Sequence, residues 1–302
     1  MTGDLRPIAA GTFVMGAPDG EFGKPPYDQN QVQVTLTHAF ELGATEVTQS
    51  EWESLCVADP SGIDKTGVED CIGPTCPVGG VTWFDAIAWL NKLSVSRGLS
   101  ACYRLDSCDG EIGEHMKCQS AEVLAASVYQ CDGYRLPTEF EFEYAARAGT
   151  TTAFYSGDIT SIPSNQDPDT CIFDANLDKI GWYCWNSGKV THPVAGKVPN
   201  AWGLFDIVGN ALEWTHSKYT PNGYGTIPLV DPPGTASALA YGDAPTTRGG
   251  IYNFSSRSAR AAWRGTASNY ARGAGLGFRI ARTMPQLADG GVDAKGSDAE
   301  AE

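Results

Sequence analysis

Apolar and polar residues alternate in two short stretches near the start of the chain. Residues 11–16 read Gly-Thr-Phe-Val-Met-Gly, and residues 32–37 read Val-Gln-Val-Thr-Leu-Thr. A period of two places alternate side chains on opposite faces of a strand, so both stretches predict half-buried strands that pair in one sheet. Residues 247–252 and 276–282 carry the next strand signals, and we expect a strand near the C-terminus to pair with the first ones.

Three helices are predicted by one N-terminal signature, the capping box. In this motif a Thr hydroxyl and an acidic side chain three residues later accept hydrogen bonds from free backbone amides. The pairs are Thr48 with Glu51, Thr82 with Asp85, and Thr138 with Glu141. After residue 150 the periodicity gives way to sequence rich in Gly, Asn and Trp, so little regular structure is expected there.

The composition is that of a folded α+β protein with much irregular structure. Of the 302 residues, 42% are hydrophobic and 19% are charged, which excludes a disordered chain. The 35 glycines and 18 prolines argue against a helical bundle. No apolar run reaches the length of a membrane span, ~18 residues. The net charge of −15 disfavours nucleic acid and anionic membrane surfaces as partners.

No repeat or internal linker divides the chain, so residues 5–283 are interpreted as one domain. Within it, residues 101–131 form an insertion rich in Cys and Asp between the second and third predicted helices. Residues 284–302 contain mostly acidic residues, Gly, Ala and Ser, and this composition predicts an acidic disordered tail.

Nine cysteines lie between residues 56 and 184, and none belongs to a Cys-x-x-Cys pair. With four histidines in the whole chain, a tetrahedral zinc site has no evident ligands. Cysteines in polar segments are typical of disulfides that staple loops, which predicts an extracytoplasmic location: periplasmic, cell-surface or secreted. The sequence as given opens without the apolar region of a signal peptide. The odd cysteine is interpreted as a small buried apolar residue, with an intermolecular bond as the alternative.

Three longer motifs occur in a fixed order. Residues 133–147 read Gly-Tyr-Arg-Leu-Pro-Thr-Glu-Phe-Glu-Phe-Glu-Tyr-Ala-Ala-Arg, residues 200–214 read Asn-Ala-Trp-Gly-Leu-Phe-Asp-Ile-Val-Gly-Asn-Ala-Leu-Glu-Trp, and Arg-Gly-Gly at 248–250 is followed by Gly-Phe-Arg at 277–279. In these motifs the chain resembles the formylglycine-generating enzyme, or sulfatase-modifying factor, family. The resemblance spans residues 8–282. It implies the family's variant of the C-type lectin fold, an α+β domain with short sheets and low regular secondary structure, to which the cysteines add disulfide-stapled loops.

The enzyme of that family oxidises a cysteine in a Cys-x-Pro-x-Arg peptide of sulfatases to formylglycine, with copper held by two cysteines. Alignment of the segment after Arg248 places Phe254 and Ala259 at the two cysteine positions, and no cysteine follows Cys184. Thiolate ligation of copper at this place is therefore excluded. Leu212 stands where the family has a Trp that lines the peptide groove. The resemblance thus implies a divergent member that lacks the family's catalytic residues.

The calcium positions of the family carry suitable residues here, because calcium prefers carboxylate, amide and carbonyl oxygens. The resemblance implies one structural site from the side chains of Asp206 and Glu213 and the carbonyls of Gly209 and Ala211. It implies a second site from Asn176, Leu177, Asn186 and Gly188. The alternative for Asp206 and Glu213 is a pair of carboxylates that cap the turn around Gly209.

Residues 248–282 contain seven arginines interleaved with aromatic residues. Guanidinium groups and aromatic faces suit anionic peptide, carboxylate or sugar ligands. The predicted ligand-binding residues are Tyr252, Phe254, Arg257, Arg260 and Trp263. The alternative, weighed for Arg257 and Arg260 and above all for three other arginines, is that they fasten the core by pairing with buried acids. These arginines are Arg248, Arg264 and Arg279, and the acids include Glu139 and Glu143.

Three function hypotheses follow. The first is a calcium-stabilised module that binds a peptide, protein or glycan, or assists another protein, without formylglycine-generating activity. The second is an oxidase of a peptide-like substrate that uses a site other than the copper–cysteine pair. The third is a ligand-binding protein whose C-terminal loop varies among close copies. Hydrolase and kinase hypotheses lack a motif in this chain.

Overall fold

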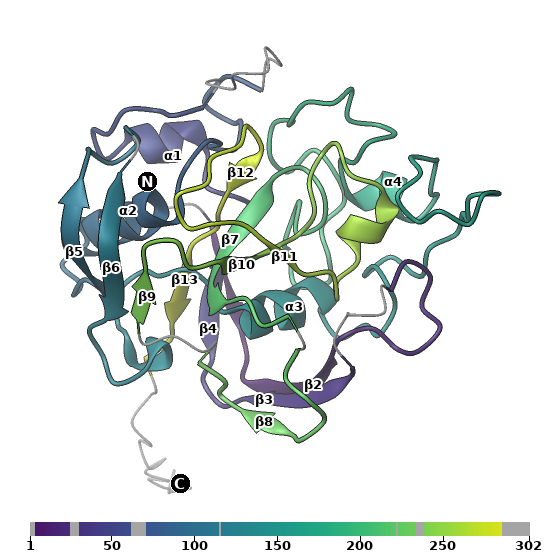
Figure 1. Cartoon of the computed structure of the whole chain (residues 1–302), viewed down its shortest axis with the longest axis horizontal. Coiled ribbons are helices and arrows are strands. Elements are labelled where there is room, and N and C mark those ends of the chain that lie inside the picture. The colour runs from purple at the N-terminus through teal and green to yellow at the C-terminus, as the bar shows by residue number, and fades with distance from the viewer. Residues whose placement is uncertain are drawn as a thin grey trace, which may run out of the picture.

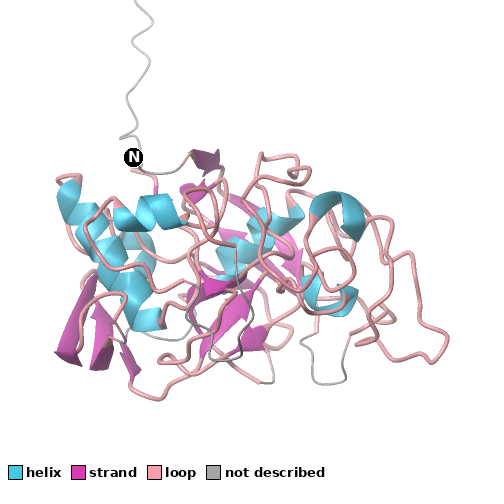
Figure 2. Cartoon of the chain, turned by 90° about the horizontal axis from the view of Figure 1, so that it is seen from above, coloured by secondary structure: helices cyan, strands magenta, loops and turns pink. Residues whose placement is uncertain are grey.

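The computed structural model describes residues 4–24, 30–61, 71–114, 116–221, 223–233 and 238–285. Loops and turns form much of the chain, with short helices and strands distributed among them (Figure 2). The described helices are α1 (Gln49–Glu53), α2 (Trp83–Ser96), α3 (Glu139–Arg147) and α4 (Leu177–Ile180), with short 3-10 helices at Val128–Gln130 and Ser256–Ala259. Within these ranges, no helix combines the length and apolar character needed to cross a membrane. Most of the predicted acidic tail, from residue 286 onward, lies outside the described residues.

All three predicted capping boxes are confirmed. The hydroxyls of Thr48, Thr82 and Thr138 accept hydrogen bonds from the backbone amides three residues later, at 3.2, 3.0 and 3.1 Å respectively. The acidic side chain of each pair accepts the backbone amide of its Thr in return. These contacts satisfy amides that the first turn of a helix leaves without a partner, which fixes where α1, α2 and α3 begin.

The predicted N-terminal strands also form and pair. Strands β2 (Gly11–Met15) and β3 (Val32–Leu36) are antiparallel, and β8 (Leu229–Val230) adds to β3 in parallel. A second sheet has the order β1 (Leu5–Ile8), β4 (Phe40–Gly43) and β13 (Ala281–Thr283). Its C-terminal strand lies beside β4, with Ala281 opposite Leu42. The expected pairing of the end of the chain with its beginning is therefore confirmed.

Two further sheets lie in the middle and at one end of the molecule (Figure 1). The middle sheet has the order β11 (Gly265–Thr266), β10 (Pro245–Arg248), β7 (Leu212–Lys218) and β12 (Leu276–Gly277). The end sheet consists of β5 (Tyr103–Asp109), β6 (Lys117–Val123) and β9 (Ala238–Ala240). The Cys- and Asp-rich insertion at 101–131 thus supplies a strand pair that the sequence pattern did not predict.

Buried apolar side chains form two clusters, one around α2 and one around α3. In the first, the rings of Trp52 and Trp89 stack at 5.7 Å, and the edge of Phe278 packs against both. The second joins Phe140 and Phe142 of α3 to the buried faces of β2, β3 and β4. Burial of this much aromatic area supplies the main driving force for folding.

Eight of the nine cysteines form disulfides: Cys71–Cys76, Cys102–Cys131, Cys108–Cys118 and Cys171–Cys184. Cys108 and Cys118 face each other across β5 and β6, while Cys102–Cys131 closes the base of the insertion. The remaining cysteine, Cys56, is exposed, so its interpretation as a buried apolar residue is wrong. The reason is local: α1 ends at Glu53, and the turn that follows gives Cys56 a left-handed backbone (φ 55°) and leaves its side chain in solvent.

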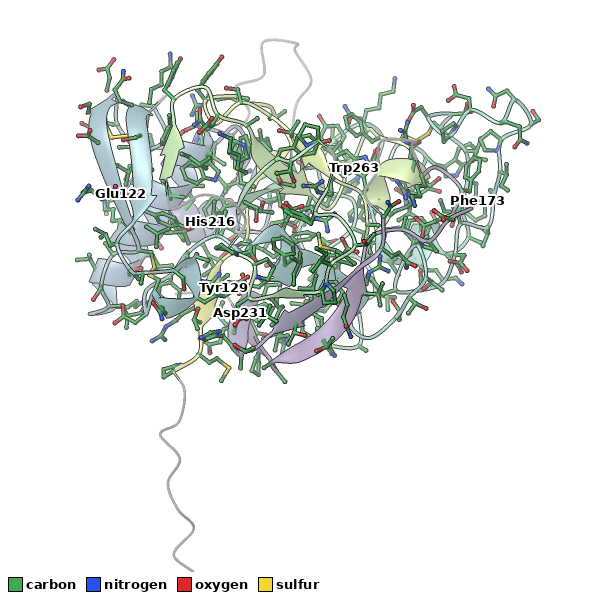
Figure 3. All side chains as sticks on the ribbon, turned by 60° about the horizontal axis from the view of Figure 1, so that its bottom comes forward. Glu122, Tyr129, Phe173, His216, Asp231 and Trp263 are labelled. Carbon is green, nitrogen blue, oxygen red and sulfur yellow. A yellow bond between two sulfur atoms is a disulfide. The ribbon has the colours of Figure 1, made fainter. Side chains whose placement is uncertain are left out.

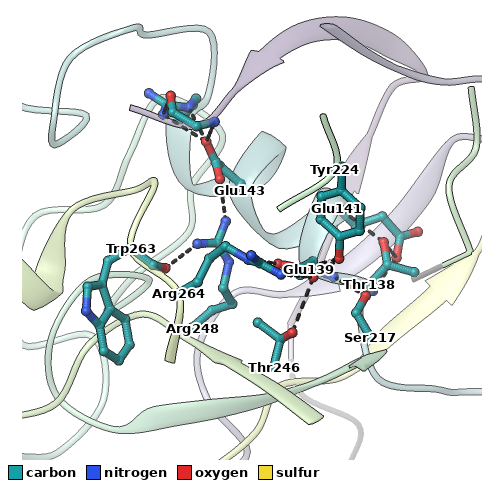
Figure 4. Close-up of polar contacts among 12 residues, drawn as sticks. Thr138, Glu139, Glu141, Glu143, Ser217, Tyr224, Thr246, Arg248, Trp263 and Arg264 are labelled. Carbon is teal, nitrogen blue, oxygen red and sulfur yellow. Dashed lines mark hydrogen bonds and ion pairs between the residues drawn. The ribbon is translucent and has the colours of Figure 1, made fainter. Parts of the chain in front are cut away.

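Three acidic residues of α3 are buried and paired with arginines, two of which, Arg248 and Arg264, come from the distant segment around β10 and β11 (Figure 4). The carboxylate of Glu139 accepts hydrogen bonds from Arg264 at 2.6 and 3.0 Å. The carboxylate of Glu141 accepts a bidentate pair from Arg135, at 2.7 and 2.8 Å. Glu143 lies between Arg147 and Arg248 and accepts from both, at 2.8 and 2.5 Å. We call these seven residues the α3 network; it anchors β10 and the segment after it to the core.

Candidate functional site

The segment that follows β10 is fixed by close backbone approaches at two glycines. Gly249 and Gly250 both adopt positive φ angles, 89° and 79°. A Cβ at Gly250 would lie 2.6 Å from the carbonyl oxygen of Ser258, so only glycine fits there. The backbone amide of Gly209 donates to the carbonyl of Gly249 at 2.7 Å, which joins this segment to the 206–213 motif. The Arg-Gly-Gly motif and the 206–213 motif therefore meet in space.

The two positions that align with copper cysteines lie on this segment. The side chain of Phe254 is 43% exposed, and Ala259, at the end of the 3-10 helix, is 2% exposed. A phenyl ring and a methyl group offer no metal ligand. The side chain at position 254 is thus exposed to solvent, and the side chain at position 259 is buried in the core.

The arginines of residues 248–282 serve mainly to fasten the core. Arg248 pairs with Glu143, Arg264 with Glu139 and Arg279 with Glu213, all with exposed fractions of 3% or less for both side chains. The alternative stated for these three arginines is therefore confirmed. Arg260 is also buried and pairs with Glu21 at 2.6 Å.

The predicted ligand-binding residues do not form one exposed set. Tyr252 and Arg260 are 5% and 1% exposed, so they support the surface from beneath. Phe254 is exposed, while Arg257 and Trp263 are partly exposed. The guanidinium of Arg257 pairs with Asp169 at 2.7 Å. Three of the five predicted residues thus reach the surface at the same place as the loop around residue 169.

Two exposed aromatic residues that the sequence analysis did not select extend this surface. Phe173 is 44% and Trp185 is 55% exposed, and their rings meet edge to face at 6.3 Å. Phe254 and Trp263 make a similar pair at 6.4 Å. We call these four residues the aromatic surface. Figure 3 shows Phe173 at one end of the molecule and Glu122 of β6 at the other, and Trp263 lies between Phe173 and Glu122.

The aromatic surface is fastened by four contacts between the segments that carry it. The disulfide Cys171–Cys184 joins the loop of Phe173 to that of Trp185. The amide of Cys184 donates to the carbonyl of Phe254 at 3.0 Å. The hydroxyl of Ser255 donates to the carbonyl of Pro168 at 2.8 Å, beside the Arg257–Asp169 pair. Aromatic side chains held in place lose little conformational entropy on binding, which favours a recognition surface.

A pocket of about 330 Å³ lies near this surface, between residues 18–22 and 153–159. Its lining includes the acidic residues Asp19, Glu21 and Asp158 and the ring of Phe22. Glu21 is the partner of Arg260 and Asp19 is the partner of Lys24. Two of the three carboxylates are therefore already neutralised by cations of the chain itself.

The residues of the first predicted calcium site are brought together, but an arginine already occupies one of the two carboxylates. Asp206 and Glu213 are both 0% exposed, and Gly209 and Ala211 lie in the turn between them. Both carboxylate oxygens of Glu213 accept hydrogen bonds from Arg279 at 2.6 Å. One oxygen of Asp206, Oδ2, accepts the amide of Ala195 at 2.6 Å, while Oδ1 is buried without a hydrogen-bond partner.

A third buried carboxylate, Glu46, belongs to the same place. Its Oε1 accepts hydrogen bonds from the side chain of Asn210 at 3.1 Å and the amide of Ala211 at 3.3 Å, and its Oε2 has no partner. Burial, together with the charges of Asp206 and Glu213, raises the pKa of Glu46 well above its usual value. Burial raises the pKa of Asp206 to about 6. We call Glu46, Asp206 and Glu213 the carboxylate cluster. Sequence reasoning missed Glu46 because it lies far away in the chain.

The second predicted calcium site is arranged differently. The Oδ1 of Asn186 accepts the amide of Tyr183, and its Nδ2 donates to Asp178 and to the carbonyl of Gly181. The Nδ2 of Asn176 donates to the carbonyl of Asp158 at 2.9 Å. Leu177 begins α4 and Gly188 is exposed. The side-chain oxygen of Asn186 is thus engaged within its own loop, and Asn186 is tied to α4 through Asp178.

Within the described ranges, no group of three or more His, Cys, Asp or Glu side chains is placed to hold a metal ion. A calcium site in the carboxylate cluster would therefore need backbone carbonyls and water besides its side chains, which calcium accepts readily because it takes six to eight oxygen ligands. The partnerless oxygens of Asp206 and Glu46 fit a hard cation, whereas the fully paired Glu213 does not.

Comparisons with known proteins agree with this geometry. The family model for the sulfatase-modifying factor enzyme 1-like domain matches residues 3–284. The formylglycine-generating enzyme of Streptomyces coelicolor is 32% identical over 300 residues, covering 92% of this chain and 88% of that protein. The inactive C-alpha-formylglycine-generating enzyme 2 of Mus musculus is 36% identical over 228 residues, covering 72% and 69%.

A solved structure shows the same fold. Treponema denticola variable protein 1 superposes with a TM-score of 0.69 and 28% sequence identity, covering 92% of this chain and 94% of that one. The α+β architecture with short sheets matches what the resemblance implied, and the four disulfides match what the cysteines predicted. The chain therefore belongs to the family of sulfatase-modifying factor enzyme 1-like domains.

Proposed function

We propose that this chain is an extracytoplasmic binding or accessory module of its family, stabilised by calcium and without formylglycine-generating activity. The observation that carries the proposal is the pair Phe254 and Ala259, which stand where the family's enzyme holds copper with two thiolates. Every cysteine of the chain lies at or before residue 184, and eight of the nine are in disulfides. Four disulfides support an oxidising compartment.

The name of one relative supports the proposed absence of activity. The mouse protein that is 36% identical to this chain is named an inactive member of the same enzyme family. A fold that has lost its reactive groups can keep the binding surface around them, because the surface depends on loops that the scaffold still positions. The aromatic surface lies around one of the two former copper positions, Phe254.

The chemistry of the aromatic surface favours a protein or peptide ligand that carries Lys or Arg. Residues 151–186, which include Phe173 and Trp185, contain three exposed Asp residues and one Lys. These are Asp158, Asp167 and Asp169, of which Asp169 pairs with Arg257. Acidic groups attract a basic ligand, and aromatic faces bind ammonium and guanidinium groups through cation–π contacts of about 0.5–2 kcal/mol each. A basic, extended segment of a partner protein therefore matches this surface better than an acidic ligand or a neutral glycan.

The absence of enzyme activity is tested with a Cys-x-Pro-x-Arg peptide incubated with the protein, copper, a reductant and oxygen. Mass spectrometry should find the cysteine unchanged, and conversion to the aldehyde would overturn the proposal. A matched double variant, Phe254→Cys with Ala259→Cys, should bind Cu(I) more tightly than the natural chain if these are the correct positions. Oxygen consumption with peptide-like substrates would instead favour the oxidase hypothesis.

Ligand binding is tested with two peptides of equal length, one rich in Lys and one rich in Glu, by calorimetry at low and high salt. The Lys-rich peptide should bind more tightly, and Trp185→Ala should weaken its binding by about tenfold, since an aromatic anchor contributes on the order of 1–2 kcal/mol. Tyr241→Ala is the control, because Tyr241 is 44% exposed but stacks on Tyr270 outside the aromatic surface. Equal binding of both peptides would contradict this ligand assignment.

A further inference from the structure

The pocket between residues 18–22 and 153–159 has the size of a site for a single side chain. Its volume of about 330 Å³ is at the low end of the range for ligand pockets, roughly 300–1,000 Å³. Its lining combines two kinds of surface. The ring of Phe22 and the side chain of Ile159, both partly exposed, are apolar, and three carboxylates complete the wall.

Two of these three carboxylates already have a cation as partner. Lys24 pairs with Asp19 at 2.9 Å, and Arg260 pairs with Glu21 at 2.6 Å. Asp158 differs from both. It is exposed, its Oδ1 accepts a backbone amide at 3.1 Å, and it forms no ion pair with any described residue. The pocket therefore presents one negative charge that the described chain does not compensate.

A single carboxylate beside an aromatic ring and an aliphatic wall suits the side chain of lysine or arginine. The carbon stem of such a side chain packs on apolar surface while its charged head stays accessible. Ammonium and guanidinium groups bind both to ring faces and to carboxylates. A calcium ion is disfavoured here because it takes six to eight oxygen ligands, and the pocket offers one unpaired carboxylate.

Both walls of the pocket lie on residues 254–263, the segment that carries half of the aromatic surface. The Nε of Arg257 donates to the carbonyl of Gly23 at 3.2 Å, and a Cβ at Gly23 would lie 3.1 Å from the Cγ of Arg257. On the other wall, the amide of Ala261 donates to the carbonyl of Ala153 at 2.8 Å. Because the pocket and the aromatic surface share one segment, we expect one ligand to contact both.

We propose that this pocket receives one Lys or Arg side chain of the ligand, with Asp158 as the group that recognises its charge. Phe22 and Ile159 contact the carbon stem. The pocket thus fixes the position of one basic residue in the ligand, and the aromatic surface binds its neighbours. This inference rests on the proposed function, since it assigns a subsite to the basic ligand proposed there.

The first experiment uses n-butylammonium, which has the stem and the head group of a lysine side chain. In the full chain labelled with ¹³C, millimolar n-butylammonium should shift the NMR signals of the Ile159 methyl groups and the Phe22 ring. Neutral n-butanol is the control ligand and should shift them much less. Signals of both residues that do not respond to n-butylammonium, or that respond equally to n-butanol, overturn the proposal.

A matched pair of variants tests the role of Asp158. Asp158→Asn keeps the size of the side chain and the oxygen that accepts the backbone amide, but removes the charge. It should weaken binding of n-butylammonium about fivefold. Asp167→Asn removes the same charge from an exposed position outside the pocket lining and should bind as the natural chain does. Equal weakening by both variants would assign the attraction to the general acidity of the region and overturn the pocket.

The second experiment locates the subsite in the ligand. Each lysine of the Lys-rich peptide is replaced in turn by norleucine, which keeps the stem and lacks the charge. One replacement should weaken binding to the natural chain about fivefold and have little effect on binding to Asp158→Asn, as expected when two groups interact directly. Independent effects of the variant and of every replacement would contradict the assignment.

Failure of this inference and failure of the proposed function give different results. If the pocket is not the subsite, the Lys-rich peptide still binds and Trp185→Ala still weakens its binding, but Asp158→Asn has no more effect than Asp167→Asn. If the chain binds no basic peptide, the peptide titrations fail with the natural chain itself. The signals of Ile159 and Phe22 in n-butylammonium then decide separately whether the pocket binds a cation.

Discussion

The α3 network and the carboxylate cluster each bury three acidic side chains, but they neutralise them differently. In the α3 network, Glu139, Glu141 and Glu143 meet four arginines. In the carboxylate cluster, Arg279 pairs with Glu213, and no ion pair to Glu46 or Asp206 occurs among the described residues. Acidic residues are therefore no guide by themselves to a functional site in this fold. The number of arginines facing the acids is what distinguishes these two buried groups.

The largest effect on stability is expected when one acid is removed from the α3 network, in which acids and arginines are balanced. Glu143→Gln leaves Arg147 and Arg248 buried without their charged partner, so the free energy of unfolding should fall by about 3–5 kcal/mol. Urea denaturation at neutral pH measures the loss. Glu53→Gln, on the exposed side of α1, is the control and should change little. A loss below about 1 kcal/mol would show that the α3 network contributes much less than its geometry suggests.

A smaller effect on stability is expected from adding calcium, whose positive charge would offset the carboxylates of the carboxylate cluster. Calcium at about a hundred times its dissociation constant should raise the free energy of unfolding by about 2.7 kcal/mol, since the ion binds only the folded chain. Urea denaturation in calcium and in EDTA gives the difference. Coincident curves would mean that calcium does not bind the cluster. Protons rather than a cation would then neutralise its carboxylates, in contrast to the arginines of the α3 network.

The pH dependence of stability gives a further test of the α3 network. Burial by itself would raise the pKa of Glu143, but the charges of Arg147 and Arg248 outweigh burial and hold this pKa below its usual value of 4.5. The unfolded chain therefore takes up the proton first as pH falls. The stability that Glu143 contributes is present above pH 4.5 and is lost as pH falls through its lowered folded-state pKa.

Denaturation curves between neutral pH and pH 3 provide the measurement. The free energy of unfolding of the natural chain should decline more steeply on the acid side than that of Glu143→Gln, in which this group does not titrate. Parallel declines of the two proteins would show that other carboxylates account for the acid sensitivity.

The smallest effect on stability is expected at the aromatic surface. Trp185→Ala should change the free energy of unfolding by no more than about 0.5 kcal/mol, because the ring is 55% exposed and contacts mainly Phe173. Its effect should appear in binding of the Lys-rich peptide instead. A large loss of stability would identify Trp185 as a structural residue and remove it from the recognition surface.

The local parts of this fold could be predicted from the sequence. Two kinds of feature depend only on neighbouring residues and are therefore visible in the sequence. These are the capping boxes at Thr48, Thr82 and Thr138 and the alternation in β2 and β3. The strands of the insertion were missed because β5 is mostly exposed and polar, and disulfides rather than an apolar face hold it in place.

The site residues were harder to predict because their roles depend on distant partners. The ligand set chosen from residues 248–282 included Arg260, which Glu21 pairs and buries, and omitted Phe173 and Trp185. Likewise, the motif at 206–213 is readable in the sequence, but nothing local indicates that Arg279 takes both oxygens of Glu213 or that Glu46 joins the cluster. Pairing across the fold decides which charged groups remain for function.

The position of β13 has a consequence for how the chain folds. The sheet β1-β4-β13 joins strands from the two ends of the described chain, and Arg248, Arg264 and Arg279 reach acids encoded far upstream. Contacts of such high sequence separation form slowly, because a large loop must close before they yield any stability. The sheet β1-β4-β13 therefore cannot be completed until the last strand of the described chain has been synthesised.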